Sequence, residues 1–141
     1  MTPSSRRHVH TQTIAMRWGD MDMMGHVNNT VYFRFMEEAR VQFFRAHGLN
    51  GGGRAAPPDA GPVVINASCS FLRALVYPGD VQVRMYLGEA GRTSVMTWYE
   101  LLPSYDGSVV YAEGGAKMCY IDKTTRKSIP LPEALRTLAG G

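Results

Sequence analysis

The segment from Tyr32 to Ala46 constrains the fold most, because it has a long helical period in a chain that otherwise alternates in the manner of strands. Apolar residues recur there three and four positions apart, and charged residues occupy the other side. The apolar positions are Tyr32, Phe35, Met36, Ala39, Phe43 and Ala46. Several of them are bulky aromatics, so we expect one long helix whose apolar stripe is buried against a large sheet.

The two ends of this helix carry recognisable capping residues. Either Asn28 or Asn29 is a suitable N-cap, and Val27 would pack onto Tyr32 if the cap is Asn28. At the other end, Gly48 is placed for a left-handed C-terminal cap. We therefore expect the helix to begin at the paired asparagines and to end just before the glycine.

Strands are predicted on both sides of the helix by alternation and β-branched composition. The predicted strands are 8–18, 63–77, 81–87, 92–102 and 108–122. A segment rich in glycine and proline, Gly48–Pro62, is expected to be a loop. Gly114 and Gly115 indicate a bulge or a close backbone approach within the last strand, and a short helix is expected over 132–140.

The order of these elements defines the fold class. A strand, a long helix and then strands in hairpin succession predict an α+β arrangement, with one helix lying across one antiparallel sheet. The chain has 141 residues, which is the length of one domain, and we place that domain at 1–141. The sheet edges invite pairing with a second copy, so we expect a homodimer or a larger homo-oligomer.

Composition argues against several kinds of partner. The net charge is +3 and the basic residues are scattered without interleaved aromatics, so no nucleic-acid partner is expected. No stretch approaches the roughly 18 apolar residues of a membrane span. No apolar run follows the basic pair near the N-terminus, so we expect no signal peptide. With two cysteines in unlike contexts, Cys69 and Cys119, we expect a reducing cytoplasm.

An acidic loop precedes the helix and is the richest candidate for chemistry. In the stretch "RWGDMDMMGHVNN", Asp20 and Asp22 lie one residue apart and His26 follows closely. A calcium loop is excluded, because Met24 and Val31 stand where further acidic ligands are required. A phosphoryl-transfer site is excluded as well, because such sites follow a parallel strand in a sheet of alternating strands and helices.

A metal site is not expected. His8 and His10 fall on one face of a predicted strand, but no acid–histidine spacing in the chain matches a zinc site. We interpret these two histidines as surface residues. Asp20 is suited to brace the loop backbone through an Asx-turn, whereas Asp22 lies too far upstream to cap the helix and is left without an evident structural role.

Acid–base or nucleophilic chemistry beside the helix N-terminus is the remaining interpretation. The first backbone N–H groups of a helix point outward and carry partial positive charge, so they can polarise a carbonyl and stabilise an oxyanion. A nearby carboxylate can attack that carbonyl or deprotonate a water molecule. An acid held on a loop next to a helix start is therefore suited to acyl transfer.

The stretch "RWGDMDMMGHVNNTVYFRFMEEAR", from Arg17 to Arg40, resembles the hotdog-fold acyl-CoA thioesterases of the 4-hydroxybenzoyl-CoA thioesterase type. It is similar to that family's pattern of a strand, G-D-x-D-x-x-G-H-V-N-N and a helix. A second, looser match is "SFLRALVYPGDVQV", from Ser70 to Val83. With the order of elements, the resemblance covers nearly the whole chain.

This resemblance implies an antiparallel five-stranded sheet wrapped around one long central helix, in dimers and often tetramers. It implies hydrolysis of an acyl-CoA thioester, with Asp22 as the catalytic carboxylate, either as nucleophile or as general base. The backbone N–H near Asn29 is implied as the donor that polarises the carbonyl. Neither a metal nor a dissociable cofactor is required.

The other candidate site residues lie close by. His26 is grouped with the catalytic residues, and it either positions water or substrate or holds the loop. Gly25, Asn28 and Tyr32 are expected to form the substrate site, with the glycine supplying a backbone conformation that other residues resist. Asn28, like His26, has loop bracing as its alternative role.

Three alternatives stay open at this stage. A non-catalytic protein that binds acyl thioesters is the first, although it would have no need of a loop carboxylate beside a carbonyl site. A hotdog hydratase or dehydratase is the second, although that chemistry favours a different arrangement of histidine and acid. Some hotdog enzymes carry their acid on the helix, where Glu37 and Glu38 stand in this chain, and we interpret both as a solvated or interface face.

Overall fold

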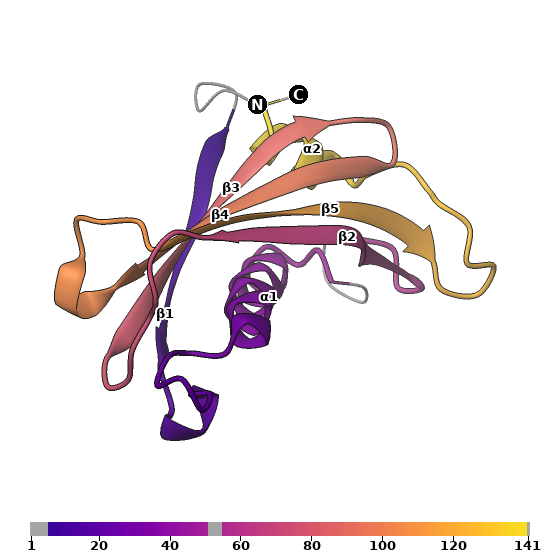
Figure 1. Ribbon diagram of the computed structural model, residues 1–141. Helices are drawn as coiled ribbons and strands as arrows, with labels where there is room; N and C mark the ends of the chain where they lie inside the picture. Colours follow the sequence, from indigo (N-terminus) through magenta and orange to yellow (C-terminus); the bar gives the residue numbers. More distant parts are fainter. Residues whose placement is uncertain (1–5, 51–54, 141) are drawn as a thin grey trace.

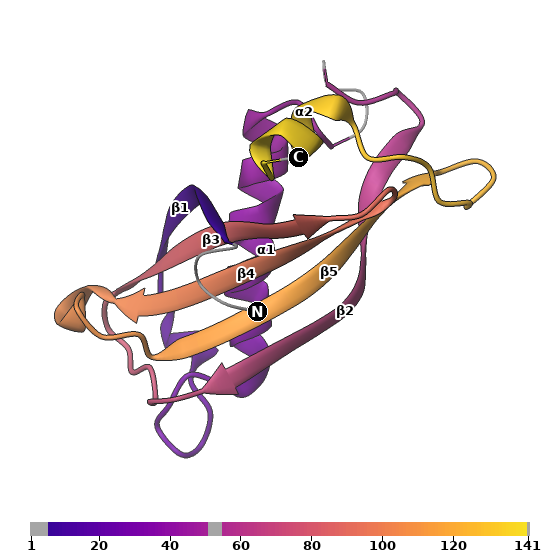
Figure 2. The same ribbon diagram turned by 90° about the horizontal axis from the view of Figure 1, so that it is seen from above.

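A computed structural model describes residues 6–50 and 55–140 of the protein, and in that part of the chain five strands form one antiparallel sheet over the long helix α1 (Figure 1). The elements in chain order are β1 (Arg7–Ala15), η2 (Trp18–Asp20), α1 (Asn29–Ala46), β2 (Ala60–Phe71), β3 (Asp80–Ala90), β4 (Ser94–Pro103), η3 (Ser104–Asp106), β5 (Ala112–Asp122) and α2 (Glu133–Leu138). The sheet order is β1-β3-β4-β5-β2, which Figure 2 shows from above. This confirms the predicted α+β fold, a five-stranded sheet wrapped around one long helix.

Helix α1 buries the predicted apolar stripe. Its buried residues include Tyr32, Phe35, Met36, Ala39 and Phe43, whereas Ala46, in the last turn, is exposed. The helix begins directly after Asn28, and it ends ahead of Gly48, whose φ of +67° is the left-handed cap conformation. No helix in the described part of the chain combines the length and the apolar character needed to cross a bilayer.

The face of the sheet that packs against the apolar stripe of α1 is set by strict alternation along β3. Val81, Val83, Met85 and Leu87 are each 0% exposed, as their predicted inward orientation requires. Each of these four residues belongs to one apolar cluster with the buried residues of α1. The helix and the sheet therefore share a single core.

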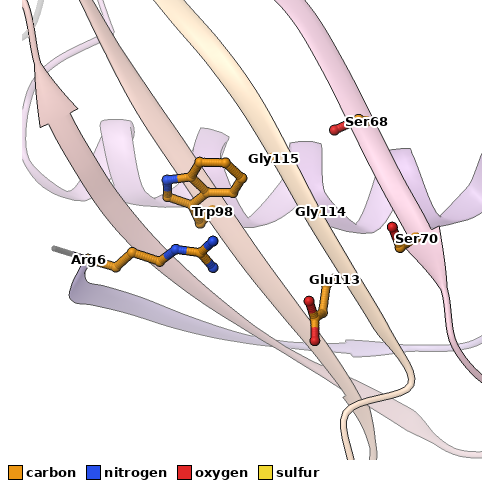
Figure 3. Close-up of a pocket in the computed structure, with 7 residues that line it drawn as sticks. All are labelled: Arg6, Ser68, Ser70, Trp98, Glu113, Gly114 and Gly115. Carbon is orange, nitrogen blue, oxygen red and sulfur yellow. The ribbon is translucent and has the colours of Figure 1, made fainter. Parts of the chain in front are cut away.

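Gly114 and Gly115 permit close approach on opposite faces of β5 rather than forming a bulge. A Cβ at Gly114 would collide with the Met36 sulfur on the helix side and would lie 3.0 Å from the Ser68 carbonyl oxygen. A Cβ at Gly115 would lie 2.8 Å from the Trp98 ring, which crosses the strand on the outer face (Figure 3). The β4–β5 register runs through both glycines without a shift.

Several strand boundaries differ from the prediction. β1 ends at Ala15 rather than Trp18, because the Arg17 N–H donates to the Asp20 carboxylate instead of to a neighbouring strand. β2 covers Ala60–Phe71 rather than 63–77, because the next two N–H groups, of Leu72 and Arg73, both donate to the Tyr111 carbonyl. β5 begins at Ala112 rather than Ser108.

The predicted loop Gly48–Pro62 is partly confirmed. Residues 51–54 lie outside the described residues, Ala55–Asp59 is irregular, and Ala60–Pro62 already belongs to β2. The short helix predicted at the C-terminal end is present as α2, where the Arg136 side chain donates to the carbonyls of Gly91 and Arg92.

The prediction that His8 and His10 share a strand face is wrong. The β1–β3 register shifts between them, so that they point to opposite faces of the sheet. The His8 ring lies 5.4 Å from the Tyr86 ring on the outer face, and the His10 ring lies 6.4 Å from Phe43 of the helix. These two histidines therefore cannot ligate one ion.

The two edges of the sheet, β1 and β2, differ in character. Strand β2 leaves large apolar side chains in water, with Val64 42%, Ile65 55% and Phe71 46% exposed. It pairs on one side with β5, and its other side faces outward at the rim of the sheet (Figure 2). A long apolar edge strand of this kind is a template for pairing with another chain.

Candidate active site

The loop between β1 and α1 folds back on itself as a small hairpin. Met21 and Val27 form an antiparallel bridge, the Asp22 N–H donates to the His26 carbonyl over 2.8 Å, and the Asn28 N–H donates to the Asp20 carbonyl over 2.9 Å. Gly25 sits at the tip with a φ of +78°, a conformation that residues with a Cβ rarely adopt. The hairpin therefore brings the two acids back beside the start of the helix.

Asp20 is the anchor of this loop. Its side chain is only 3% exposed, and its carboxylate accepts hydrogen bonds from the Arg34 guanidinium over 2.8 Å and from the Arg17 backbone N–H over 2.8 Å. The Arg17 guanidinium lies 3.3 Å away and is 66% exposed. Because Arg34 belongs to α1, this partly buried ion pair ties the loop to the helix. The support role expected for Asp20 is confirmed. Its carboxylate forms no Asx-turn, however, and binds the arginines instead.

Asp22 has a structural role that the sequence did not reveal. One carboxylate oxygen, Oδ1, accepts hydrogen bonds from the backbone N–H groups of Met24 over 2.9 Å and His26 over 3.4 Å. The Asx-turn geometry predicted for Asp20 therefore belongs to Asp22. Its second oxygen, Oδ2, accepts no hydrogen bond from the residues that the structure describes, and it remains available for chemistry.

A pocket of about 540 Å³ opens beside this carboxylate. It is lined by Trp18, Gly19, Met21, Asp22, Met23, Gly25 and Tyr77. Tyr77 comes from the segment after β2, which the loop holds through the hydrogen bond from the Val27 N–H to the Leu75 carbonyl over 2.9 Å. Asp22 thus sits in a concave site whose walls are mainly aromatic rings and thioethers.

The N-terminus of α1 offers a backbone donor next to this loop. Asn28 is the N-cap, and its side-chain oxygen accepts from the Thr30 N–H and the Thr30 hydroxyl, each over 3.0 Å. The Asn28 carbonyl accepts from the Val31 N–H over 2.9 Å. Within the described ranges no hydrogen bond engages the Asn29 N–H, so this group keeps its donor capacity at the positive end of the helix.

The structure brings some of the predicted site residues together and leaves others apart. Asp22 and Gly25 line the same pocket, whereas His26, Asn28, Asn29 and Tyr32 are outside its lining. The His26 side chain is exposed at the loop surface, and Asn28 serves the helix cap.

Tyr32 is occupied within the core. Its ring is 2% exposed, its hydroxyl oxygen accepts a hydrogen bond from the Leu75 N–H over 3.0 Å, and its ring meets Phe71 edge-on at 4.9 Å. Burial raises the pKa of the Tyr32 hydroxyl above its usual value. The tyrosine therefore fixes the segment that carries Tyr77.

Other nucleophiles and acids are less well placed. Burial raises the pKa of the Cys69 thiol to about 11, so this thiol stays protonated at neutral pH and is a poor nucleophile. On the helix, Glu37 is exposed and Glu38 is half-buried. No group of three or more His, Cys, Asp and Glu side chains suited to hold a metal occurs in the described residues.

A second, smaller concavity of about 130 Å³ lies on the outer face of the sheet, away from α1 (Figure 3). The Arg6 guanidinium stacks 4.1 Å from the centre of the Trp98 ring there, beside the exposed side chains of Ser68, Ser70 and Glu113. No histidine lines it to activate a serine hydroxyl. The pocket at Asp22 is therefore the better candidate for an active site.

Four residues that contribute to the site escaped the sequence analysis. Arg34 stood among the charged residues of the helix, and nothing in its spacing identified Asp20 as its partner. Tyr77 is distant in sequence from the acidic loop. Trp18 and Met23 did carry a signal, because large apolar residues in a polar loop are unusual, and each is largely exposed in the structure.

Comparison with known proteins identifies the family. Residues 16–137 match the family model of the Thioesterase-like superfamily. This match covers most of the chain, and the protein belongs to that superfamily. Its five-stranded sheet around a long helix is the hotdog fold.

Solved structures agree with this assignment. The Pseudomonas aeruginosa protein named "PA2801 protein, a putative Thioesterase" is 37% identical, with a TM-score of 0.84, and the match covers 93% of this chain and 98% of that one. "A putative acyl-CoA thioesterase" from Xanthomonas campestris is 34% identical, with a TM-score of 0.70, over 82% of this chain and 95% of that one. Slr0204, a 1,4-dihydroxy-2-naphthoyl-CoA thioesterase from Synechocystis, shares the fold at 18% identity, with a TM-score of 0.79 over 93% of this chain and 95% of that one.

Replacing Asp20 by asparagine tests the anchor of the loop. Asp20→Asn removes the charge that Arg34 pairs with inside the protein, and we expect a loss of about 1–3 kcal/mol in the free energy of unfolding. Arg17→Gln is the matched control, because it removes only the exposed member of the cluster, and a loss below about 0.5 kcal/mol is expected. Urea unfolding measures both, and equal losses in the two variants would contradict the anchoring role.

Proposed function

We propose that the protein is an acyl-CoA thioesterase, which hydrolyses a thioester to a free acid and coenzyme A. The observation that carries this proposal is the Asp22 carboxylate, whose Oδ2 accepts no hydrogen bond from the described residues and which lines the pocket of the loop that leads into α1. Membership of the Thioesterase-like superfamily supports the reaction class. The name of the Xanthomonas structure supports acyl-CoA as the form of the substrate.

In the proposed mechanism the thioester carbonyl oxygen accepts a hydrogen bond from the Asn29 N–H. The positive end of α1 then stabilises the negative charge that develops on this oxygen. Asp22 either attacks the carbonyl carbon itself or removes a proton from the attacking water. In either route the carbon–sulfur bond breaks, and coenzyme A leaves as the thiolate and takes up a proton. If Asp22 is the nucleophile, its carboxylate first holds the acyl group as a mixed anhydride, which water then hydrolyses to the free acid and the regenerated carboxylate. If Asp22 is the general base, the water that it deprotonates supplies the hydroxyl of the product acid directly. These steps need neither a metal nor a dissociable cofactor.

The remaining loop residues hold this geometry. Gly25 supplies the left-handed turn at the tip of the hairpin and lines the pocket without a side chain. Asn28 fixes the first turn of the helix and so the direction of the Asn29 N–H. His26 presents its ring at the surface of the loop, where we assign it to positioning the substrate or its attacking water.

A homodimer formed through β2 is part of the proposal. A second copy of the sheet would cover the exposed edge of β2 and the apolar side chains of Val64, Ile65 and Phe71. Dimers can pair further into tetramers through other faces. The two cysteines are free thiols in the structure, which fits an enzyme of the reducing cytoplasm.

Asp22→Asn tests the chemistry. Asparagine keeps an oxygen that accepts from the Met24 and His26 N–H groups, so the loop geometry is retained while the negative charge is lost. We expect kcat for coenzyme A release from acyl-CoA to fall by about 10²–10⁴-fold. Binding of a non-hydrolysable S-alkyl-coenzyme A should change little.

Glu133→Gln, on α2, is the control for loss of a carboxylate away from the site, and its kcat should match the native protein. Undiminished turnover in Asp22→Asn would contradict the assignment, and Glu37 and Glu38 would be the next acids to replace. Absence of coenzyme A release from every thioester supplied would contradict the proposed activity itself.

Ile65→Lys tests the β2 interface. A charge on this edge strand should hinder pairing of two sheets, and we expect sedimentation to shift from dimer toward monomer. Thr11→Lys places the same charge on the opposite edge strand, β1, and should leave the assembly unchanged. A native protein that sediments as a monomer would refute the proposed dimer.

A further inference from the structure

The pocket beside Asp22 keeps large apolar side chains in water. Trp18 is 78% exposed, Met23 99% and Tyr77 38%, and all three line this pocket. Exposed apolar groups gathered around a concave site mark a place where a ligand is bound, because water contact of this kind costs free energy until it is removed. An apolar ligand would remove this water contact.

The pocket offers no positive charge to its contents. Its lining contains neither lysine nor arginine, and its one charged member is Asp22. Arg17, which precedes Trp18, and Arg34 of α1 both direct their guanidinium groups to Asp20, at 3.3 Å and 2.8 Å. A carboxylate placed in this pocket would therefore meet the Asp22 charge without a counter-ion.

We propose that this pocket receives the acyl group of the substrate, and that it selects uncharged apolar acyl groups over those that end in a carboxylate. This inference rests on the proposed thioesterase function and narrows its substrate class. Trp18 and Tyr77 provide rigid aromatic walls, and Met23 provides a flexible thioether that adjusts to acyl groups of different shape.

Met23 is the specificity residue of this arrangement. Its side chain is exposed and lines the pocket, while Met24, its neighbour, is 75% exposed and lies outside the lining. A positive charge at position 23 would therefore lie where a terminal carboxylate of the acyl group needs a partner. The same charge at position 24 would add equally to the net charge of the protein without facing the pocket.

Binding of non-hydrolysable thioethers tests the inference directly. S-octyl-coenzyme A and an S-alkyl-coenzyme A of the same length with a terminal carboxylate are titrated into the native protein by calorimetry. We expect the octyl compound to bind about tenfold or more tightly, because the unpaired carboxylate is disfavoured. Equal binding, or tighter binding of the carboxylate compound, would overturn the inference.

The paired variants Met23→Arg and Met24→Arg sharpen the test. Met23→Arg should lower the ratio of octyl to carboxylate binding affinity by about tenfold, because the guanidinium pairs with the terminal carboxylate. Met24→Arg should leave the preference as in the native protein. A preference that shifts equally in both variants would show a general charge effect and would overturn the role of Met23.

Failure of this inference and failure of the proposed activity are distinguishable. Thioether binding does not depend on hydrolysis, so the octyl preference stands even if Asp22→Asn retains full turnover. Conversely, rapid hydrolysis of octanoyl-coenzyme A and of a dicarboxylic acyl-coenzyme A of equal length, with the same kcat/KM, would keep the thioesterase and reject the selectivity. Trp18→Ala separates the proposal from a role in assembly. If this variant changes the sedimentation of the protein but not the affinity for S-octyl-coenzyme A, the surface belongs to a contact with a second copy of the chain and the proposal is overturned.

Discussion

The ion pair between the buried Asp20 carboxylate and the half-buried Arg34 is the interaction on which the candidate site depends. A carboxylate that is 3% exposed is stable as a charge only with close partners, and the loop supplies them from its own backbone and from α1. The Asp20 carbonyl also accepts the N–H of the helix cap residue Asn28. One residue thus joins the end of β1, the acidic hairpin and the helix start. The hairpin that carries Asp22 is held against the segment that leads into the helix as a consequence.

Much of the fold could be predicted from periodicity. The apolar stripe of α1 and the alternation along β3 are local signals, and Asn28 and Gly48 mark the helix ends through backbone requirements that few other residues meet. The ends of the strands were harder to predict from the sequence, because they depend on hydrogen bonds to groups outside the strand. β1 stops where the Arg17 N–H finds the Asp20 carboxylate, and β2 stops where two amides turn to the Tyr111 carbonyl. A one-residue shift in β1 also separated His8 from His10, and no pattern in the sequence reports such a shift.

The sequence pointed to the loop that carries the candidate site, but not to every residue that surrounds it. The pattern around Asp20 and Asp22 identified the loop, but it assigned the backbone-bracing turn to the wrong acid, since both acids lie at plausible spacing. Tyr32 was expected to contact the substrate because it lies near the start of the helix. In the structure its hydroxyl oxygen accepts a hydrogen bond from the Leu75 N–H in the core. Tyr77 reaches the pocket from another part of the chain through tertiary contacts alone. Long-range pairing, rather than local propensity, decides such placements.

The central claim is that the amide at the start of α1 polarises the substrate carbonyl that Asp22 acts upon, and Asn29→Pro tests it most directly. Proline is favoured at the first helical position, and Asn28, with φ −57° and ψ 138°, already has the conformation required before proline, so the helix should form while the N–H is lost. We predict a fall of about 10²–10³-fold in kcat with little change in thermal stability, and a far smaller fall for Asn29→Ala, which keeps the N–H. Native kcat in a folded Asn29→Pro protein would contradict the account.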